Sequence, residues 1–172
     1  QVHAYDADRK RLAPIIERLK RAGTHNVQVH DSTKGLSNLR ERCDQVLVDA
    51  PCTGTGTWRR RPDTKWRLTQ RALEERVSQQ ADALDQAKRF VRPGGKLVYV
   101  TCSVLSEEND RQMAAFLAAN PDFSLTSALA DWQTLFGPNA PRPVSADGNT
   151  LTLTPATTGT DGFFFASLVR NA

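Results

Sequence analysis

Short apolar runs that alternate with helical segments are the feature that most constrains the fold of this chain. The strand-like runs are residues 2–5, 27–30, 45–48 and 96–100. The helix-like segments between them are residues 9–21, 36–42 and 71–91, the last ended by Pro93-Gly94-Gly95. This alternation predicts an α/β fold whose sheet is mostly parallel, with helices on both faces. Residues 45–48 are apolar enough to predict a strand that is buried on both faces.

The C-terminal part of the chain departs from this alternation. Ser106 is predicted to cap a helix whose first turn contains the acids 107–108, where they suit the helix dipole. Residues 126–149 predict an extended surface segment, and residues 151–153 and 163–169 predict an antiparallel hairpin. The length of 172 residues suits one domain better than two, so a single domain is predicted over the whole chain.

Polar and reactive side chains follow the predicted strands where each strand ends. Asp6, Asp31 and Asp49 each come directly after a strand, and Cys52 and Cys102 follow shortly after the third and fourth strands. Any one of these acids alone could be a turn or cap residue. In parallel sheets, however, ligands bind beyond the carboxyl ends of the strands. Three acids and two thiols at one edge therefore predict a site, in which acids can accept hydrogen bonds from a ribose or from the amino group of an adenine.

The two loop thiols are the most informative pair. Adjacent parallel strands could bring Cys52 and Cys102 together, and a thiolate is a nucleophile when nearby positive charge or a helix N-terminus stabilises it. A cysteine is also often a small buried hydrophobe, which is the interpretation preferred for Cys43. A redox disulfide is a third possibility, although this spacing matches no known redox motif.

The positive charge of the chain is concentrated in one segment. The net charge is +4, and residues 56–71 hold six basic side chains and one acid, so the rest of the chain is close to neutral. Trp58 and Trp66 flank the arginines of this segment, and aromatic rings beside guanidinium groups suit unpaired bases beside phosphates. The alternative is a solvated basic loop whose two tryptophans fold into the core.

Several classes of protein are excluded by composition. No apolar stretch is long enough to span a bilayer. The chain has no C-x-x-C pair, and its histidines lie within the first thirty residues, so no metal site is predicted. No signal segment is recognisable, and a cytoplasmic location is expected.

Four motifs in order resemble a known family. Residues 49–56 read Asp-Ala-Pro-Cys-Thr-Gly-Thr-Gly, and Arg-Arg-Arg-Pro-Asp and Lys-Trp follow by residue 66. Thr-Cys-Ser at 101–103 precedes Glu-Glu-Asn at 107–109, and residues 161–164 read Asp-Gly-Phe-Phe. These motifs closely resemble the D-A-P-C-S-G-x-G, R-R-x-P-D-x-K-W, T-C-S-x-x-x-x-E-E-N and D-G-F-F signatures of the NOL/NOP/Sun-type RNA cytosine carbon-5 methyltransferases, in particular the bacterial ribosomal RNA enzymes.

The resemblance implies a fold, a cofactor and roles for the site residues. The implied fold is the Rossmann-like fold of class I S-adenosylmethionine-dependent methyltransferases, with S-adenosylmethionine as cofactor. Cys102 would be the thiolate that adds to carbon-6 of cytosine, and Cys52 would assist product release; thiol chemistry alone could not choose between them. Asp49 would accept from the cytosine amino group or contact the cofactor, while Asp6 would bind the cofactor ribose and Asp31 its adenine end.

The resemblance also implies an RNA partner, ribosomal RNA in preference to transfer RNA. The residues expected to position the RNA backbone or a flipped base are Arg59, Arg60, Arg61, Lys65 and Trp66.

One element of the family pattern is absent. The family's glycine-rich cofactor loop and the first strand of its sheet would precede Gln1, so the chain is expected to be a truncated form that by itself binds the cofactor weakly or not at all. The alternatives to an enzyme are a non-catalytic RNA-binding fragment that uses residues 58–71 and a thiol redox protein.

Overall fold

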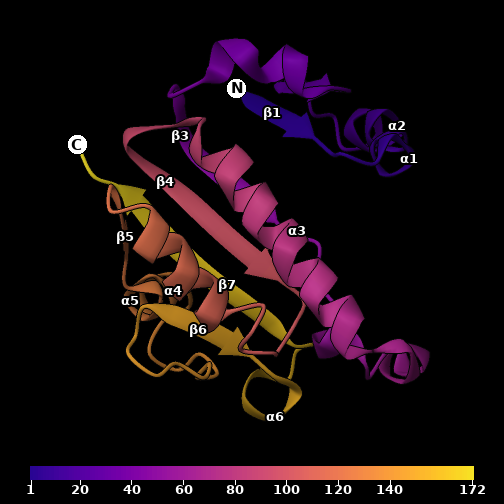
Figure 1. The fold of residues 1–172 in the computed structure, drawn as a ribbon, viewed down its shortest axis with the longest axis vertical. Coiled ribbons are helices and arrows are strands. Elements are labelled where there is room, and N and C mark those ends of the chain that lie inside the picture. The colour runs from indigo at the N-terminus through magenta and orange to yellow at the C-terminus, as the bar shows by residue number, and fades with distance from the viewer. The chain divides into compact units, whose positions relative to one another are not determined.

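The computed structural model describes residues 1–172, which form two compact units (Figure 1). The first unit is Gln1–Arg40 and the second is Glu41–Ala172. The expectation of one catalytic domain over the whole chain stays a prediction. No helix is both long enough and apolar enough to cross a membrane.

The first unit is a parallel two-stranded sheet with short helices. Strands β1 (Val2–Tyr5) and β2 (Val27–His30) pair in register, with Tyr5 opposite His30. The single helix predicted over residues 9–21 is wrong, because Pro14 has no N–H to continue it. Two helices, α1 (Arg9–Leu12) and α2 (Ile15–Arg21), stand in its place. The short helix predicted at 36–42 is a 3-10 helix, η1 (Thr33–Leu39).

The second unit is built on a mixed five-stranded sheet in the order β3-β4-β7-β5, with β6 paired to β7. Its strands are β3 (Cys43–Asp49), β4 (Val91–Thr101), β5 (Phe123–Leu125), β6 (Thr150–Leu153) and β7 (Phe163–Arg170). Strands β3 and β4 are parallel, whereas β7 is antiparallel to β4, β5 and β6. The predicted C-terminal hairpin is therefore confirmed. The sheet is mixed rather than mostly parallel, because the long strand β7 lies antiparallel beside β4.

Helices pack on this sheet and on one another. They are α3 (Gln70–Lys88), α4 (Asp110–Ala119), α5 (Ala128–Phe136) and α6 (Pro155–Thr158), with 3-10 helices η2 (Thr55–Thr57) and η3 (Pro62–Arg67) in the loop after β3. Helix α3 packs against β3, β4 and α4, and α5 packs against β6 and β7 (Figure 1). Fully buried Tyr99 and Phe164 make an edge-to-face contact in the core.

Two sequence-based boundaries around the third helix are wrong. The helix predicted to reach Val91 ends at Lys88, and Val91 is the fully buried first residue of β4. Pro93-Gly94-Gly95 does not end the helix but lies inside β4, where pairing with β3 shifts register between Cys43 and Gln45. An irregular strand start tolerates a proline and glycines because ladder hydrogen bonds are already interrupted there.

Three further predictions fail for reasons of packing and capping. Helix α4 begins at Asp110 rather than directly after Ser106, and residues 106–109 form a turn. The segment 126–149 is not wholly extended, because α5 begins after Ser127, whose side chain accepts the backbone N–H of Ala130. Leu47 is 63% exposed, so β3 is not buried on both faces; it is the edge strand of its sheet.

Candidate active site

The parallel pairing of β3 and β4 places the two thiol loops side by side. Asp49, the last residue of β3, pairs with Val100 near the end of β4. Beyond the strands, the N–H of Ala50 donates to the carbonyl of Val100 at 3.0 Å, and the N–H of Gly56 donates to the carbonyl of Cys102 at 3.0 Å. The backbone thus continues to join the two loops past the end of the sheet.

The sulfur atoms of Cys52 and Cys102 lie 3.3 Å apart, within hydrogen-bond distance, and both thiols are free and half-buried. The hydrogen bond from Cys52 lowers the pKa of Cys102 to about 7, against the opposing effects of burial and of the negative charge of Asp49. The same hydrogen bond, followed by burial, raises the pKa of Cys52. The distance alone suits either thiol as donor, and the directions of the two pKa shifts favour a Cys102 thiolate that accepts a hydrogen bond from a protonated Cys52.

A buried carboxylate holds the turn that carries Cys52. Glu108 is fully buried, and its Oε1 accepts the backbone N–H of Thr53 at 2.8 Å while its Oε2 accepts the Thr53 hydroxyl at 2.5 Å. The Nε2 of Gln80, a buried residue of α3, donates to both the carbonyl of Pro51 and Oε1 of Glu108 at 2.9 Å. Sequence reasoning placed Glu108 in a helical first turn and missed this role. The only available signal was its place in the Glu-Glu-Asn motif.

A second hydrogen-bonded cluster holds the Cys102 loop. The hydroxyl of Thr101 donates to Oδ1 of Asn109 at 2.7 Å, and Nδ2 of Asn109 donates to the carbonyl of Ser103 at 3.0 Å. The hydroxyls of Thr55 and Ser103 lie 3.0 Å apart, which links this loop to the one after β3. Since these groups are buried, each bond satisfies a polar atom that water cannot reach.

The Asp-Gly-Phe-Phe motif packs directly on the loop after Cys52. The N–H of Gly162 donates to the carbonyl of Gly56 at 2.8 Å. Asp161, only 9% exposed in its side chain, forms ion pairs with Arg59, at 3.5 Å, and with Arg60. Two of the arginines predicted to bind RNA are therefore also held by a carboxylate of this unit.

The remaining predicted RNA residues are exposed. Trp66 is 83% exposed, which excludes a core role for its ring, whereas Trp58 is half-buried. The ammonium of Lys65 lies 5.6 Å from the ring centre of Trp58 and 5.7 Å from that of Trp66, within the range of cation–π contact. Arg61 is exposed and makes no ion pair. The segment thus presents the exposed ring of Trp66 together with the positive charge of Arg61, which no carboxylate neutralises.

The acids predicted to bind the cofactor lie at strand ends in both units. In the first unit, Asp6 and Asp31 directly follow the paired ends of β1 and β2. Asp6 accepts the N–H of Asp8 at 2.8 Å, and exposed Asp31 lies 3.8 Å from Arg9. Asp49 belongs to the second unit and is exposed. Carboxylates in these positions fit the hydroxyl and amino donors of a nucleoside. No group of three His, Cys, Asp or Glu side chains could hold a metal ion.

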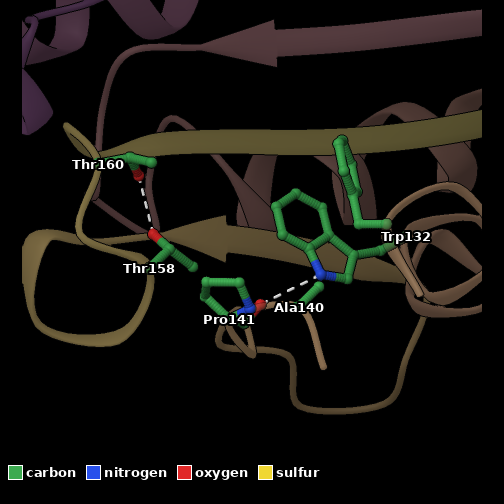
Figure 2. Close-up of a pocket in the computed structure, with 6 residues that line it drawn as sticks. Trp132, Ala140, Pro141, Thr158 and Thr160 are labelled. Atoms are coloured by element: carbon green, nitrogen blue, oxygen red, sulfur yellow. Dashed lines mark hydrogen bonds between the residues drawn. The ribbon is translucent and has the colours of Figure 1, made fainter. Parts of the chain in front are cut away.

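An open pocket of about 280 Å³ lies elsewhere in the second unit (Figure 2). It is lined by Trp132, Phe136, Ala140, Pro141, Thr158 and Thr160. Its polar contacts are internal: Nε1 of Trp132 donates to the carbonyl of Pro141 at 3.1 Å, and the hydroxyls of Thr158 and Thr160 lie 2.8 Å apart. It contains no thiol or ionisable side chain, so the reactive groups of this unit remain those at the ends of β3 and β4.

Comparison with known proteins identifies relatives over nearly the whole chain. The chain is 37% identical to a "Ribosomal RNA small subunit methyltransferase B" of Klebsiella pneumoniae (strain 342), over 99% of this chain and 36% of the relative. It is 32% identical to the protein of that name from Shewanella oneidensis, over 97% of this chain and 37% of the relative. The chain therefore spans little more than a third of the length of these curated relatives.

Solved structures show the same fold. The crystal structure of NSun6 from Pyrococcus horikoshii with SFG has a TM-score of 0.80 and 28% identity, and the match covers 100% of this chain and 42% of that one. A methyltransferase homolog from Pyrococcus horikoshii has a TM-score of 0.73 and 28% identity, over 98% of this chain and 52% of that one. The α/β fold thus matches those of class I S-adenosylmethionine-dependent methyltransferases.

The family model described as "16S rRNA methyltransferase RsmB/F" matches residues 1–169. This match confirms the family that the motifs indicated, and its members are S-adenosylmethionine-dependent methyltransferases of ribosomal RNA. The chain belongs to the RsmB/F family of ribosomal RNA cytosine carbon-5 methyltransferases.

Proposed function

We propose that the protein transfers a methyl group from S-adenosylmethionine to carbon-5 of a cytosine in ribosomal RNA, with Cys102 as the nucleophile. The observation that carries this proposal is the 3.3 Å contact between Cys52 and Cys102 at the carboxyl ends of β3 and β4. An isolated buried thiol would have its pKa raised, whereas that of Cys102 is lowered to about 7. The lowered pKa favours the thiolate form of Cys102, which is the form that can attack.

The chemistry needs such a thiolate because carbon-5 of cytosine is a weak nucleophile. S-adenosylmethionine, when bound, would supply the methyl group on a sulfonium sulfur, and breaking that carbon–sulfur bond would leave a neutral thioether. The Cys102 sulfur forms a bond to carbon-6, and the electron pair of the 5,6 double bond shifts to make carbon-5 nucleophilic. After carbon-5 has gained its methyl group, a base takes the carbon-5 proton. The electron pair left behind re-forms the double bond and breaks the bond between carbon-6 and Cys102.

Cys52 suits the last of these steps. Its raised pKa keeps the thiol protonated, and that S–H lies against the Cys102 sulfur. A hydrogen bond to a departing thiolate stabilises it as a leaving group. Asp49 ends the strand beside these thiols, where its carboxylate could accept from the exocyclic amine of cytosine and so position the base.

The other proposed contacts divide between cofactor and RNA. Asp6 and Asp31 would accept hydrogen bonds from the ribose and adenine of the cofactor, because both lie at the carboxyl ends of paired parallel strands. Arg59, Arg60, Arg61, Lys65 and Trp66 would contact the RNA backbone or a flipped base, with Trp66 as an exposed stacking surface. A ribosomal RNA substrate would place the reaction in the cytoplasm.

Mechanism-based trapping tests the proposal on the full-length gene product. RNA that contains 5-azacytidine lacks the proton whose removal releases the enzyme, so a covalent protein–RNA band should form on a denaturing gel. Cys102→Ser should abolish this band. Cys52→Ala should instead leave persistent adducts even on ordinary 16S rRNA. A band that persists in Cys102→Ser would contradict the proposed nucleophile.

The exposed Trp66 and unpaired Arg61 also favour a second candidate, a module that binds RNA without catalysis. Such a module would show salt-sensitive RNA binding that survives loss of both thiols, with no trapped band in any variant. A redox role would instead require reversible oxidation of Cys52 and Cys102 with turnover.

A further inference from the structure

We infer that Glu108 is the positioning residue of Cys52, holding its turn so that the thiol can assist release of the methylated product. The inference rests on the proposed function and extends it to a residue that does not touch the reacting atoms. It also includes Gln80 and Thr53, through which Glu108 acts on the turn.

The contacts of Glu108 converge on the residues on either side of Cys52. On the C-terminal side, both the N–H and the hydroxyl of Thr53 donate to the carboxylate. On the N-terminal side, the carbonyl of Pro51 accepts from Gln80, whose same Nε2 also donates to Glu108. Cys52 is thus fixed at both ends while its own side chain remains free to meet Cys102.

The carboxylate is costly to bury, so its presence calls for a role. Glu108 is fully buried. The donors of the hydrogen bonds that it accepts are all neutral, and none of them is a cationic side chain. Activating the nucleophile cannot be that role, because the negative charge of Glu108 raises the pKa of Cys102. Fixing the Cys52 turn is the role that its contacts support.

Glu107 provides a matched control from the adjacent position. It belongs to the same turn, but its carboxylate pairs with Arg111 at 3.3 Å and lies 3.3 Å from the Ser106 hydroxyl, and it makes no hydrogen bond to Thr53 or to either thiol. Replacing Glu107 therefore changes the same local charge without touching the Cys52 turn.

The test measures covalent adducts on ordinary 16S rRNA, transcribed in vitro, with S-adenosylmethionine and the full-length gene product. Glu108→Ala removes three hydrogen bonds to the carboxylate, each of which can be worth about tenfold, so it should raise the adduct yield at least about tenfold, toward that of Cys52→Ala. Glu108→Gln keeps an acceptor for the Thr53 N–H and should restore most release. Glu107→Ala should match the unsubstituted protein, and adding Glu108→Ala to Cys52→Ala should raise the yield no further.

The direction of the effect separates positioning from loss of structure. A variant that merely unfolds forms less adduct, both on ordinary RNA and on 5-azacytidine RNA, whereas a mispositioned Cys52 gives more on ordinary RNA. Thr53→Val, which removes only one donor, serves if Glu108→Ala does not fold. If Cys52→Ala accumulates adduct while folded Glu108→Ala and Thr53→Val do not, the inference is wrong. If Cys52→Ala itself accumulates none, the proposed function fails first and the inference with it.

Discussion

The close approach of Gly56 and Gly162 gives Gly56→Ala the shortest contact of any glycine-to-alanine change in the second unit. A Cβ added at Gly56 would lie 2.1 Å from the carbonyl oxygen of Gly162 and 2.6 Å from its carbonyl carbon. Both atoms belong to the backbone, so no side chain can rotate away. The two backbones must separate, and the hydrogen bonds that join Gly56 to Gly162 and to Cys102 are strained or lost.

The cost can be worked out from these contacts. Forcing a methyl group into a packed interior costs about 1–3 kcal/mol. The two backbone hydrogen bonds contribute about 1 kcal/mol each, so the free energy of unfolding should fall by about 3–5 kcal/mol. For a folded unit of this size, that corresponds to a fall in Tm of about 10 °C.

Thermal unfolding followed by circular dichroism on the full-length gene product measures this fall. Gly159→Ala is the control. Gly159 lies in the connection between β6 and β7 that also contains Gly162, its φ is +69°, and an added Cβ there would have no atom within 4 Å. Gly159→Ala carries only the strain of a positive φ, about 1–2 kcal/mol, whereas Gly56 has no positive φ and Gly56→Ala carries only the clash. If Gly56→Ala melts no lower than Gly159→Ala, the two glycine backbones do not meet as described.

The remaining predictions concern reactivity and RNA binding. The rate of trapping on 5-azacytidine RNA should rise as the pH increases through about 7, because deprotonation creates the Cys102 thiolate. Cys52→Ala should move this midpoint to higher pH, since it removes the hydrogen bond that lowers the Cys102 pKa; an unmoved midpoint in rate measurements across pH would contradict this assignment. Trp66→Ala should weaken RNA binding about tenfold or more in fluorescence anisotropy, through loss of base stacking, without lowering Tm because the ring is 83% exposed. Arg61→Ala should reduce the slope of log binding constant against log salt by about one, and an unchanged slope would mean that Arg61 contacts no phosphate.

The features that the sequence predicts well are those determined by the local pattern of apolar and polar residues. Strands β1 and β2 lie at the residues expected from their apolar runs, and β3 contains the run at 45–48. Because parallel neighbours end at the same edge of a sheet, the approach of Cys52 and Cys102 could also be predicted, and the 3.3 Å contact confirms it. The roles of these thiols stay proposals.

The features that the sequence predicts poorly depend on partners far along the chain. Pro93-Gly94-Gly95 looks like a helix stop, yet Val91 pairs with Cys43 and draws the segment into β4. Helix α5 was missed because its surroundings are rich in turn-forming residues. The start of this helix is set by its capping residue, Ser127, whose side chain accepts the backbone N–H of Ala130. In both cases tertiary pairing or capping overrides composition.

Glu108 shows the same limit at the site itself. Two acids in sequence after a serine favour the first turn of a helix, and nothing local distinguishes Glu107 from Glu108. The distinction arises only when the turn after β3, more than fifty residues earlier, delivers Thr53 to one of them. Several contacts then join the same two loops, among them the thiol pair, the Glu108–Thr53 bonds, the Thr55–Ser103 pair and the bond between Gly56 and Cys102. Since displacements of about 1 Å can cost about a hundredfold in rate, changes confined to the Glu108–Thr53 bonds should reduce product release more steeply than they reduce stability.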